Sequence, residues 1–146
     1  MRFSAELRAA VLVLAAAAAA CGSDDQSTDL GEGGAPPVDT EYETFNERPC
    51  PDDSYLSFES FGGPFLITWC NGCHAVGLPE AERQGAPLGV DFDDIGLIRA
   101  QAERIWARSG DHNLTMPPVA GPEDDERAML GEWLACGAPT AADMEE

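Results

Sequence analysis

The chain has 146 residues and a formal net charge of −19, with 27 acidic residues, eight arginines and no lysine. A charge this negative argues against binding to nucleic acid and against binding to anionic lipid through charge. It favours a partner protein with a basic docking face, and an acidic surface that only aids solubility is the alternative. The length fits one small domain with extensions, and five cysteines in so short a chain indicate an oxidising compartment.

The first twenty residues have the pattern of an export signal. Two arginines at positions 2 and 8 precede an apolar stretch over residues 9–20, which is too short and too rich in alanine for a transmembrane helix. Small residues that end in Cys21 resemble the lipobox of bacterial lipoproteins, whose cysteine is acylated. We expect a signal peptide at 1–20 and a lipid on Cys21 that anchors the protein to a membrane. Ordinary secretory cleavage is the alternative.

Composition divides the rest of the chain into three parts. Residues 21–46 are rich in Ser, Asp, Gly, Glu and Pro, so we expect a flexible acidic tether behind the lipidated cysteine. Residues 47–139 carry the apolar segments of one folded domain, and residues 140–146 form an acidic tail. A domain of this size makes a thin core by itself.

Three helices are predicted in the folded region, and no segment has the alternation of a strand. The first, over about 62–69, starts at a Gly-Gly-Pro sequence and is apolar on nearly all sides, so we expect it to be buried. The second runs over about 91–110 and begins with several aspartates that can cap it. The third runs over about 122–137. The predicted fold class is all-α.

The first helix leads into a C-x-x-C-H sequence made by Cys70, Cys73 and His74. Residues three apart in a helical turn face the same way, so two thiols can bond to neighbouring haem vinyl groups while the histidine ligates the iron. A zinc site would need a second pair of ligands, and His112 is the only other histidine. A thioredoxin-type site would need a βαβ pattern, which is not visible around the motif. We therefore expect one covalent haem c.

Met116 lies between the second and third predicted helices, directly before Pro117 and Pro118. The prolines hold the loop extended without needing backbone donors. A thioether is a soft ligand that haem iron accepts. We expect Met116 to be the sixth iron ligand, with His112 as its main rival and core packing as the ordinary role of a methionine.

These features together resemble the small, His/Met-ligated monohaem cytochromes c. The resemblance covers about residues 62–137 and rests mainly on the C-x-x-C-H sequence and on Met116 with its two prolines. It implies an all-α fold wrapped around one haem. In that family a glycine eight positions before the first haem cysteine lets the first and last helices cross closely, and Gly62 holds that position. A proline carbonyl beyond the haem histidine commonly accepts that histidine's N–H, and Pro87 is the candidate.

Two cysteines remain once Cys21 is assigned to the lipid and the C-x-x-C-H cysteines to the haem. They are Cys50 and Cys136. An exported protein with two thiols left over most economically pairs them. A Cys50–Cys136 disulfide would close a loop of about 86 residues and would contribute roughly 4 to 5 kcal/mol in the chain-entropy model.

The expected function is one-electron transfer by an iron that cycles between Fe(II) and Fe(III). No general acid, nucleophile or small-molecule substrate site is evident, so we expect a carrier rather than an enzyme, acting alone or within a larger oxidoreductase complex. Export and lipidation place it on the periplasmic side of a membrane or at the cell surface. A haem-based sensor or peroxidatic enzyme and a thiol-disulfide oxidoreductase stay open as alternatives.

Three arginines are expected to be solvated rather than paired with haem propionates: Arg83, Arg99 and Arg104.

Overall fold

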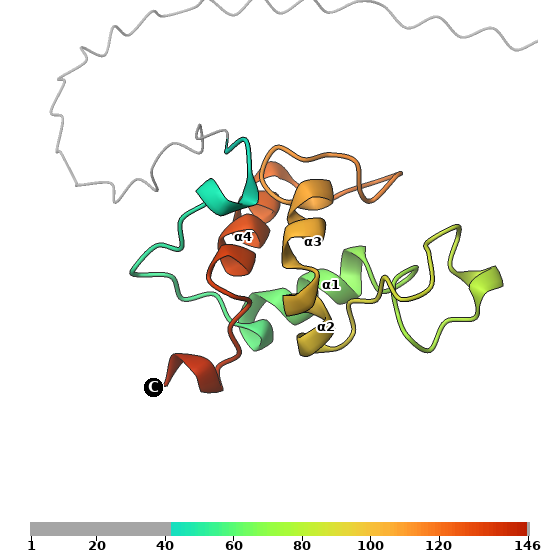
Figure 1. The fold of residues 1–146 in the computed structure, drawn as a ribbon, viewed down its shortest axis with the longest axis horizontal. Coiled ribbons are helices and arrows are strands. Elements are labelled where there is room, and N and C mark those ends of the chain that lie inside the picture. Colours follow the sequence, from blue (N-terminus) through green and yellow to red (C-terminus); the bar gives the residue numbers. More distant parts are fainter. Residues whose placement is uncertain (1–41, 146) are drawn as a thin grey trace, which may run out of the picture. The chain divides into compact units, whose positions relative to one another are not determined.

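A computed structural model of the protein describes residues 42–145. Regular structure within that range is helical and includes no strand, which confirms the predicted all-α class. Four α-helices carry most of it (Figure 1): α1, Gly63–Trp69; α2, Ile95–Ala100; α3, Ala102–Ser109; and α4, Asp124–Ala135. Shorter 3-10 or π-helical turns accompany them: η1, Phe45–Glu47; η2, Phe58–Gly62; η3, Glu80–Glu82; and η4, Ala142–Met144. None of the helices in this range is long and apolar enough to cross a membrane.

The signal peptide expected at 1–20, the lipid on Cys21 and the tether up to residue 41 lie outside the described residues. The end of the expected tether is part of the fold. The ring of Phe45 packs against that of Trp106 with 5.8 Å between centroids, and the Arg48 guanidinium lies 4.9 Å from the Tyr42 ring centroid. The folded region therefore begins before residue 47.

Helix α1 continues directly from the π-helical turn η2, where the Ser57 hydroxyl accepts a hydrogen bond from the Ser60 N–H. A proline in the first turn of α1 needs no backbone partner there. The helix buries Phe65 and Leu66, but Ile67 is 71% exposed, so the expectation of a helix buried on all sides is wrong. Successive helical residues point about 100° apart, so a helix with one face on the core exposes part of its circumference.

Close contact between the start of α1 and helix α4 occurs at Gly62. A Cβ atom on Gly62 would overlap the indole ring of Trp133, which is fully buried on α4. The Trp133 indole N–H donates to the Pro139 carbonyl at 3.1 Å, and its ring lies 6.4 Å from that of Phe58 between centroids. The close approach expected at Gly62 is confirmed, and it leaves no room for a side chain.

The single helix expected over about 91–110 is two helices in the structure, separated at Gln101. Asp94 caps α2 by accepting a hydrogen bond from the Leu97 N–H at 3.1 Å. Gln101 then leaves the helical conformation, with φ −118° and ψ 14°, and its side-chain amide donates to the carbonyls of Asp91 and Leu97. A side chain that bonds to the backbone in this way competes with the helical ladder. The spacing of the apolar residues does not predict this break.

Helix α4 lies within the predicted 122–137 range and packs on α3. The core is formed by side chains from all four helices and from the loop before α2; its largest members are Phe65, Leu66, Phe92, Ile98, Ile105, Trp106, Leu130, Trp133 and Leu134. Cys136 at the end of α4 forms a disulfide with Cys50, with 4.7 Å between the two Cα atoms. The disulfide expected from the sequence is therefore present.

Candidate functional site

Cys70, Cys73 and His74 lie together in one tight turn at the end of α1. The N–H groups of Cys73 and His74 both donate to the Cys70 carbonyl, at 3.0 and 2.9 Å. The Cys70 N–H donates in turn to the Leu66 carbonyl, so the turn continues the helix. Both thiols are free; Cys70 is buried and Cys73 is half-buried. One turn thus presents two thiols and an imidazole.

The environment of Cys70 disfavours its charged form. Burial, and to a smaller extent the nearby Cys73, raise the pKa of the Cys70 thiol to about 12. A thiolate is costly where water cannot solvate it. At neutral pH Cys70 is therefore a protonated thiol and a poor nucleophile.

The His74 ring is held on both its edge and its face. Its Nδ1 lies 2.8 Å from the Val90 carbonyl oxygen, and its ring stacks on that of Phe92 with 4.8 Å between centroids. Because a carbonyl only accepts, Nδ1 carries the proton and Nε2 keeps its lone pair. Nε2 makes no hydrogen bond within the described residues. The imidazole is therefore oriented with one nitrogen available as a ligand.

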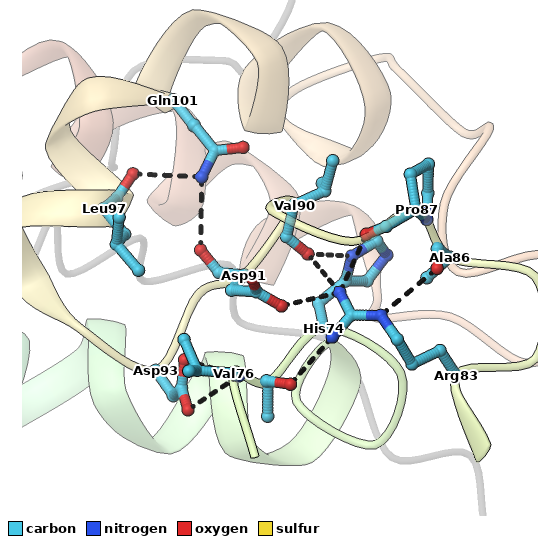
Figure 2. Close-up of polar contacts among 11 residues, drawn as sticks. His74, Val76, Arg83, Ala86, Pro87, Val90, Asp91, Asp93, Leu97 and Gln101 are labelled. Atoms are coloured by element: carbon cyan, nitrogen blue, oxygen red, sulfur yellow. Dashed lines mark hydrogen bonds and ion pairs between the residues drawn. The ribbon is translucent and has the colours of Figure 1, made fainter. Parts of the chain in front are cut away.

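The partner of His74 corrects the expectation for Pro87. The acceptor is Val90, whereas the Pro87 carbonyl accepts from Arg83 Nη2 at 2.8 Å. The loop after His74 brings both carbonyls near the guanidinium, and only that of Val90 reaches the imidazole (Figure 2). The spacing of a family motif could not decide between two carbonyls of the same loop.

Arg83 lies at the centre of this loop and is 1% exposed. Its guanidinium and Nε donate to five groups, as Figure 2 shows: the carbonyls of Ala75, Ala86, Pro87 and Val90 and the carboxylate of Asp91, at 2.6 to 3.2 Å. The expectation that Arg83 is solvated on the surface is wrong. A loop without regular structure must satisfy its inward carbonyls, and one buried arginine does so here.

Hydrogen bonds hold the backbone of Met116, and the residue is partly exposed. The Met116 N–H donates to the Arg108 carbonyl at 2.8 Å, and the Met116 carbonyl accepts from Ser109 Oγ at 3.2 Å and from Arg127 Nη1 at 3.1 Å. The Met116 side chain is 39% exposed. The peptide bond to Pro117 is cis. The loop therefore holds the residue in place and leaves the thioether uncovered.

His112, the rival sixth ligand, lies on the same loop and is exposed. Its ring meets the ring of Trp106 edge to face, with 6.1 Å between centroids. The Trp106 indole N–H donates to the Asp111 carboxylate, which also pairs with Arg48. The structure thus gives the His112 ring a contact with Trp106.

Eight large apolar residues are exposed among the described residues, and two of them, Tyr55 and Met144, lie apart from the candidate ligands. The other six lie in the region around the C-x-x-C-H turn and on the loop around Met116: Ile67, Val76, Leu88, Leu114, Met116 and Val119. Burial of apolar surface is favourable by roughly 25 cal/mol per Å². These two segments are therefore where a large apolar group would gain most from contact with the chain.

Sequence reasoning did not find the residues that support the two candidate ligands. Arg83, Val90 and Phe92 surround His74, and Arg127 holds the Met116 carbonyl. A buried arginine bonded to carbonyls has no characteristic spacing. The available signal was indirect, since a long loop with little regular structure needs polar side chains to satisfy its inward backbone groups.

The other two arginines considered for propionates differ from Arg83. Arg99 donates to the Ala138 carbonyl and pairs with Asp143, with about two fifths of each charged side chain exposed. Arg104 is exposed on α3, as expected. Among residues 42–145, no group of three or more His, Cys, Asp or Glu side chains gathers as a metal site would.

Comparisons with protein families, with curated proteins and with solved structures find no match to this chain.

Proposed function

We propose that the protein is a one-electron carrier that holds one haem c covalently, in a cytochrome c-like helical domain. Cys70 and Cys73 would form the two thioether bonds, and His74 and Met116 would be the two protein ligands of the iron. One observation carries the proposal: a single turn presents two free thiols three residues apart and then an imidazole whose Nδ1 is bonded and whose Nε2 is free.

The donor set and its surroundings fit a haem. Thioether formation needs reduced cysteines, and the motif cysteines are free while Cys50 and Cys136 pair with each other. A porphyrin needs apolar contacts, and six of the eight large exposed apolar residues lie on the segments that carry His74 and Met116. In the same turn the buried Asn71 Oδ1 has no hydrogen-bond partner among the described residues, which is a mark of a contact still to be made.

The chain's own residues would fix both ligands in advance. Val90 and Phe92 orient the His74 imidazole, and three hydrogen bonds fix the Met116 backbone. When bound, the haem supplies an iron that changes between Fe(II) and Fe(III). Ligands that are held by hydrogen bonds and stacking of their own move little when the charge of the metal changes. Small movement of the ligands favours electron transfer over substrate binding.

Charge and the N-terminal sequence support the proposed setting. With a net charge of −19, the protein would attract a partner with a basic docking face, at a rate that falls as salt rises. The export pattern and Cys21 support a lipid anchor on the periplasmic side of a membrane or at the cell surface. The proposal covers a carrier that acts alone and one that serves within an oxidoreductase complex.

Visible spectroscopy of the full-length protein, made with c-type cytochrome maturation machinery, tests the proposal. We expect haem absorbance that stays with the denatured chain and a low-spin, six-coordinate spectrum in the native protein. A variant with Cys70→Ser and Cys73→Ser should lose covalent haem. The matched control, Cys50→Ser with Cys136→Ser, removes two other cysteines and should keep it. A colourless wild-type protein would contradict the proposal.

Two further variants identify the sixth ligand. We expect Met116→Ala to turn the low-spin spectrum into a high-spin one, because the iron loses a ligand. His112→Ala should leave the spectrum unchanged, since its ring contacts Trp106 in the structure. The opposite pair of results would assign the sixth position to His112.

One observation favours a second candidate function, a haem-based sensor or peroxidatic enzyme. The side chain of Met116 is 39% exposed, and a ligand that is easily displaced would open the iron to a small molecule. Binding of carbon monoxide to the ferrous wild-type protein would favour this function over a carrier. Thiol-disulfide exchange is less well supported, because the raised pKa of Cys70 keeps its thiol protonated.

A further inference from the structure

The loop that carries Met116 is bound to helix α4 by one buried side chain, Arg127, which is 4% exposed. Its Nη1 donates to three backbone carbonyls, those of Ser109 at 3.0 Å, Asn113 at 2.9 Å and Met116 at 3.1 Å. These acceptors are spaced along the chain from the end of α3 to Met116. One guanidinium therefore contacts this segment at three points, in addition to the backbone hydrogen bond from the Asp111 N–H to the Arg127 carbonyl at 2.9 Å.

The charge of Arg127 is not balanced by a carboxylate within the described residues. The ion pairs found there involve Arg48, Arg83 and Arg99 instead. A buried guanidinium is costly to desolvate, and carbonyl acceptors satisfy its hydrogen bonds without neutralising it. An apolar side chain would avoid that cost, so stability alone is a weak reason for an arginine at this position.

The contacts of Met116 give a stronger reason. Its N–H donates to the Arg108 carbonyl, and its own carbonyl accepts from Ser109 Oγ and Arg127 Nη1. The Met116 side chain stays 39% exposed. Arg127 thus acts on the backbone of a residue whose thioether is left free to bind something else.

We propose that Arg127 is a positioning residue for Met116. By holding the carbonyls of Ser109, Asn113 and Met116, it keeps the thioether at the iron and the sixth position closed. This inference rests on the proposed haem ligation by Met116. It adds to the proposed haem site a residue of α4, Arg127, which acts only through the backbone of the loop that carries Met116.

The experiment compares four full-length, haem-loaded proteins: the wild type, Arg127→Met, Arg127→Lys and Arg99→Met. Two signals report on Met116, the methionine-to-iron charge-transfer absorption of the ferric form and carbon monoxide binding to the ferrous form. Arg99→Met is the matched control, because Arg99 also donates to a backbone carbonyl, that of Ala138, on a different part of the chain.

We expect the wild type and Arg99→Met to show the charge-transfer absorption and to exclude carbon monoxide. Arg127→Met should lose that absorption and bind carbon monoxide about tenfold more readily or better, since loss of charge-assisted hydrogen bonds shifts such an equilibrium by roughly that factor. Arg127→Lys should recover wild-type behaviour at least in part, because an ammonium has three donors for the same three carbonyls. Recovery by lysine would show that donation to the loop matters, beyond the bulk of the side chain.

Arg127→Met with wild-type absorption and wild-type exclusion of carbon monoxide would overturn the proposal. If Arg127→Met does not fold, Ser109→Ala removes the other donor to the Met116 carbonyl and should shift both signals in the same direction by a smaller amount. An unchanged Ser109→Ala protein would then overturn it. A wild-type protein without covalent haem would overturn the proposed function as well. Covalent haem without the methionine absorption would leave the haem proposal standing and overturn the role of Arg127.

Discussion

The Val90 carbonyl accepts two hydrogen bonds at once, from His74 Nδ1 at 2.8 Å and from Arg83 Nη2 at 3.0 Å. Its position therefore depends on a buried arginine that also pairs with Asp91. Because the acceptor sets the orientation of the imidazole, the support of His74 extends one residue beyond its direct partner. Arg83 is the side chain whose loss would release the most contacts in the loop after His74.

Arg83→Met is expected to destabilise the fold by about 3 to 5 kcal/mol, because it leaves the buried Asp91 carboxylate and several carbonyls without their donor. Arg99→Met should cost about 1 kcal/mol or less, since its ion pair is partly exposed to solvent. Urea unfolding followed by far-UV circular dichroism measures both free energies. Equal losses in the two variants would show that burial of Arg83 contributes nothing.

The two motif cysteines are expected to differ in reactivity in haem-free protein with its disulfide intact. Burial raises the pKa of Cys70 from 9.0 to about 12, which lowers its thiolate fraction at pH 8 roughly a thousandfold. Iodoacetamide should therefore label the half-buried Cys73 at least about tenfold faster than Cys70. Labelling of Cys70 should increase as the pH rises toward 12. Tandem mass spectrometry assigns the label to each residue, and equal rates at pH 8 would contradict the prediction.

At the scale of single residues, the sequence predicted the motif residues and the cysteine pair, but it did not predict the hydrogen-bond partner of His74. The C-x-x-C-H turn and the Cys50–Cys136 pair followed from residue type and spacing, and the structure has both features. The partner of His74 was assigned to Pro87 and is Val90. Which carbonyl of a loop reaches an imidazole depends on the fold of that loop, and here a buried Arg83 determines it.

At the scale of helices, the contact between α1 and α4 depends on the absence of a side chain at Gly62. Gly62→Ala is expected to destabilise the fold by about 1 to 3 kcal/mol, because the new Cβ would overlap the buried Trp133 ring. Gly77→Ala is the matched control, since a Cβ there would have no neighbour within 4 Å, and it should change stability by less than about 0.5 kcal/mol. Chemical denaturation of both variants checks the difference. A tolerated alanine at Gly62 would mean that α4 can move away without cost.

The turn η4 and the residues before it are attached to α2 through Asp143. Hydrogen bonds from the Thr140 N–H and hydroxyl, and then the Arg99 guanidinium, lower the pKa of Asp143 from 3.8 to about 2. A carboxyl with a lowered pKa stabilises the fold above pH 3.8, and this contribution is lost as the pH falls through about 2. The stability gap between wild type and Asp143→Asn should therefore shrink between pH 5 and pH 2. Urea unfolding at both pH values measures the gap, and a constant gap would contradict the assignment.

Helix positions were easier to predict than helix boundaries. The three predicted helical regions are helical, yet the second is divided at Gln101 because its side chain bonds to the carbonyls of Asp91 and Leu97. The first exposes Ile67, although its composition is apolar on nearly all sides. Apolar periodicity reports which residues can face a core. It does not report side-chain bonds to the backbone, and it does not report which apolar residues of a helix stay exposed.

At the scale of the whole molecule, long-range hydrogen bonds and a disulfide add to the stability that a small core provides. The buried cluster is formed by about a dozen side chains, and buried arginines bind the loops on either side of α2 and α3 in addition to the apolar contacts of Val90 and Phe92. The disulfide joins Cys50, near the start of the folded region, to the end of α4. In the proposed haem-loaded protein the cofactor would add further apolar contacts from within.

The last prediction concerns that disulfide. It closes a loop of 86 residues, so its removal should cost roughly 4 to 5 kcal/mol in the chain-entropy model, as an upper value. Thioether bonds to haem resist reductants, so dithiothreitol should act on Cys50 and Cys136 alone and lower the urea midpoint of the haem-loaded wild type. The control is Cys50→Ser with Cys136→Ser, whose midpoint should be low from the start and insensitive to dithiothreitol. Intact-mass analysis after alkylation should add two labels to the wild type only after reduction. Labelling of both cysteines before reduction, or a midpoint that reductant does not change, would show that the disulfide does not hold the native protein together.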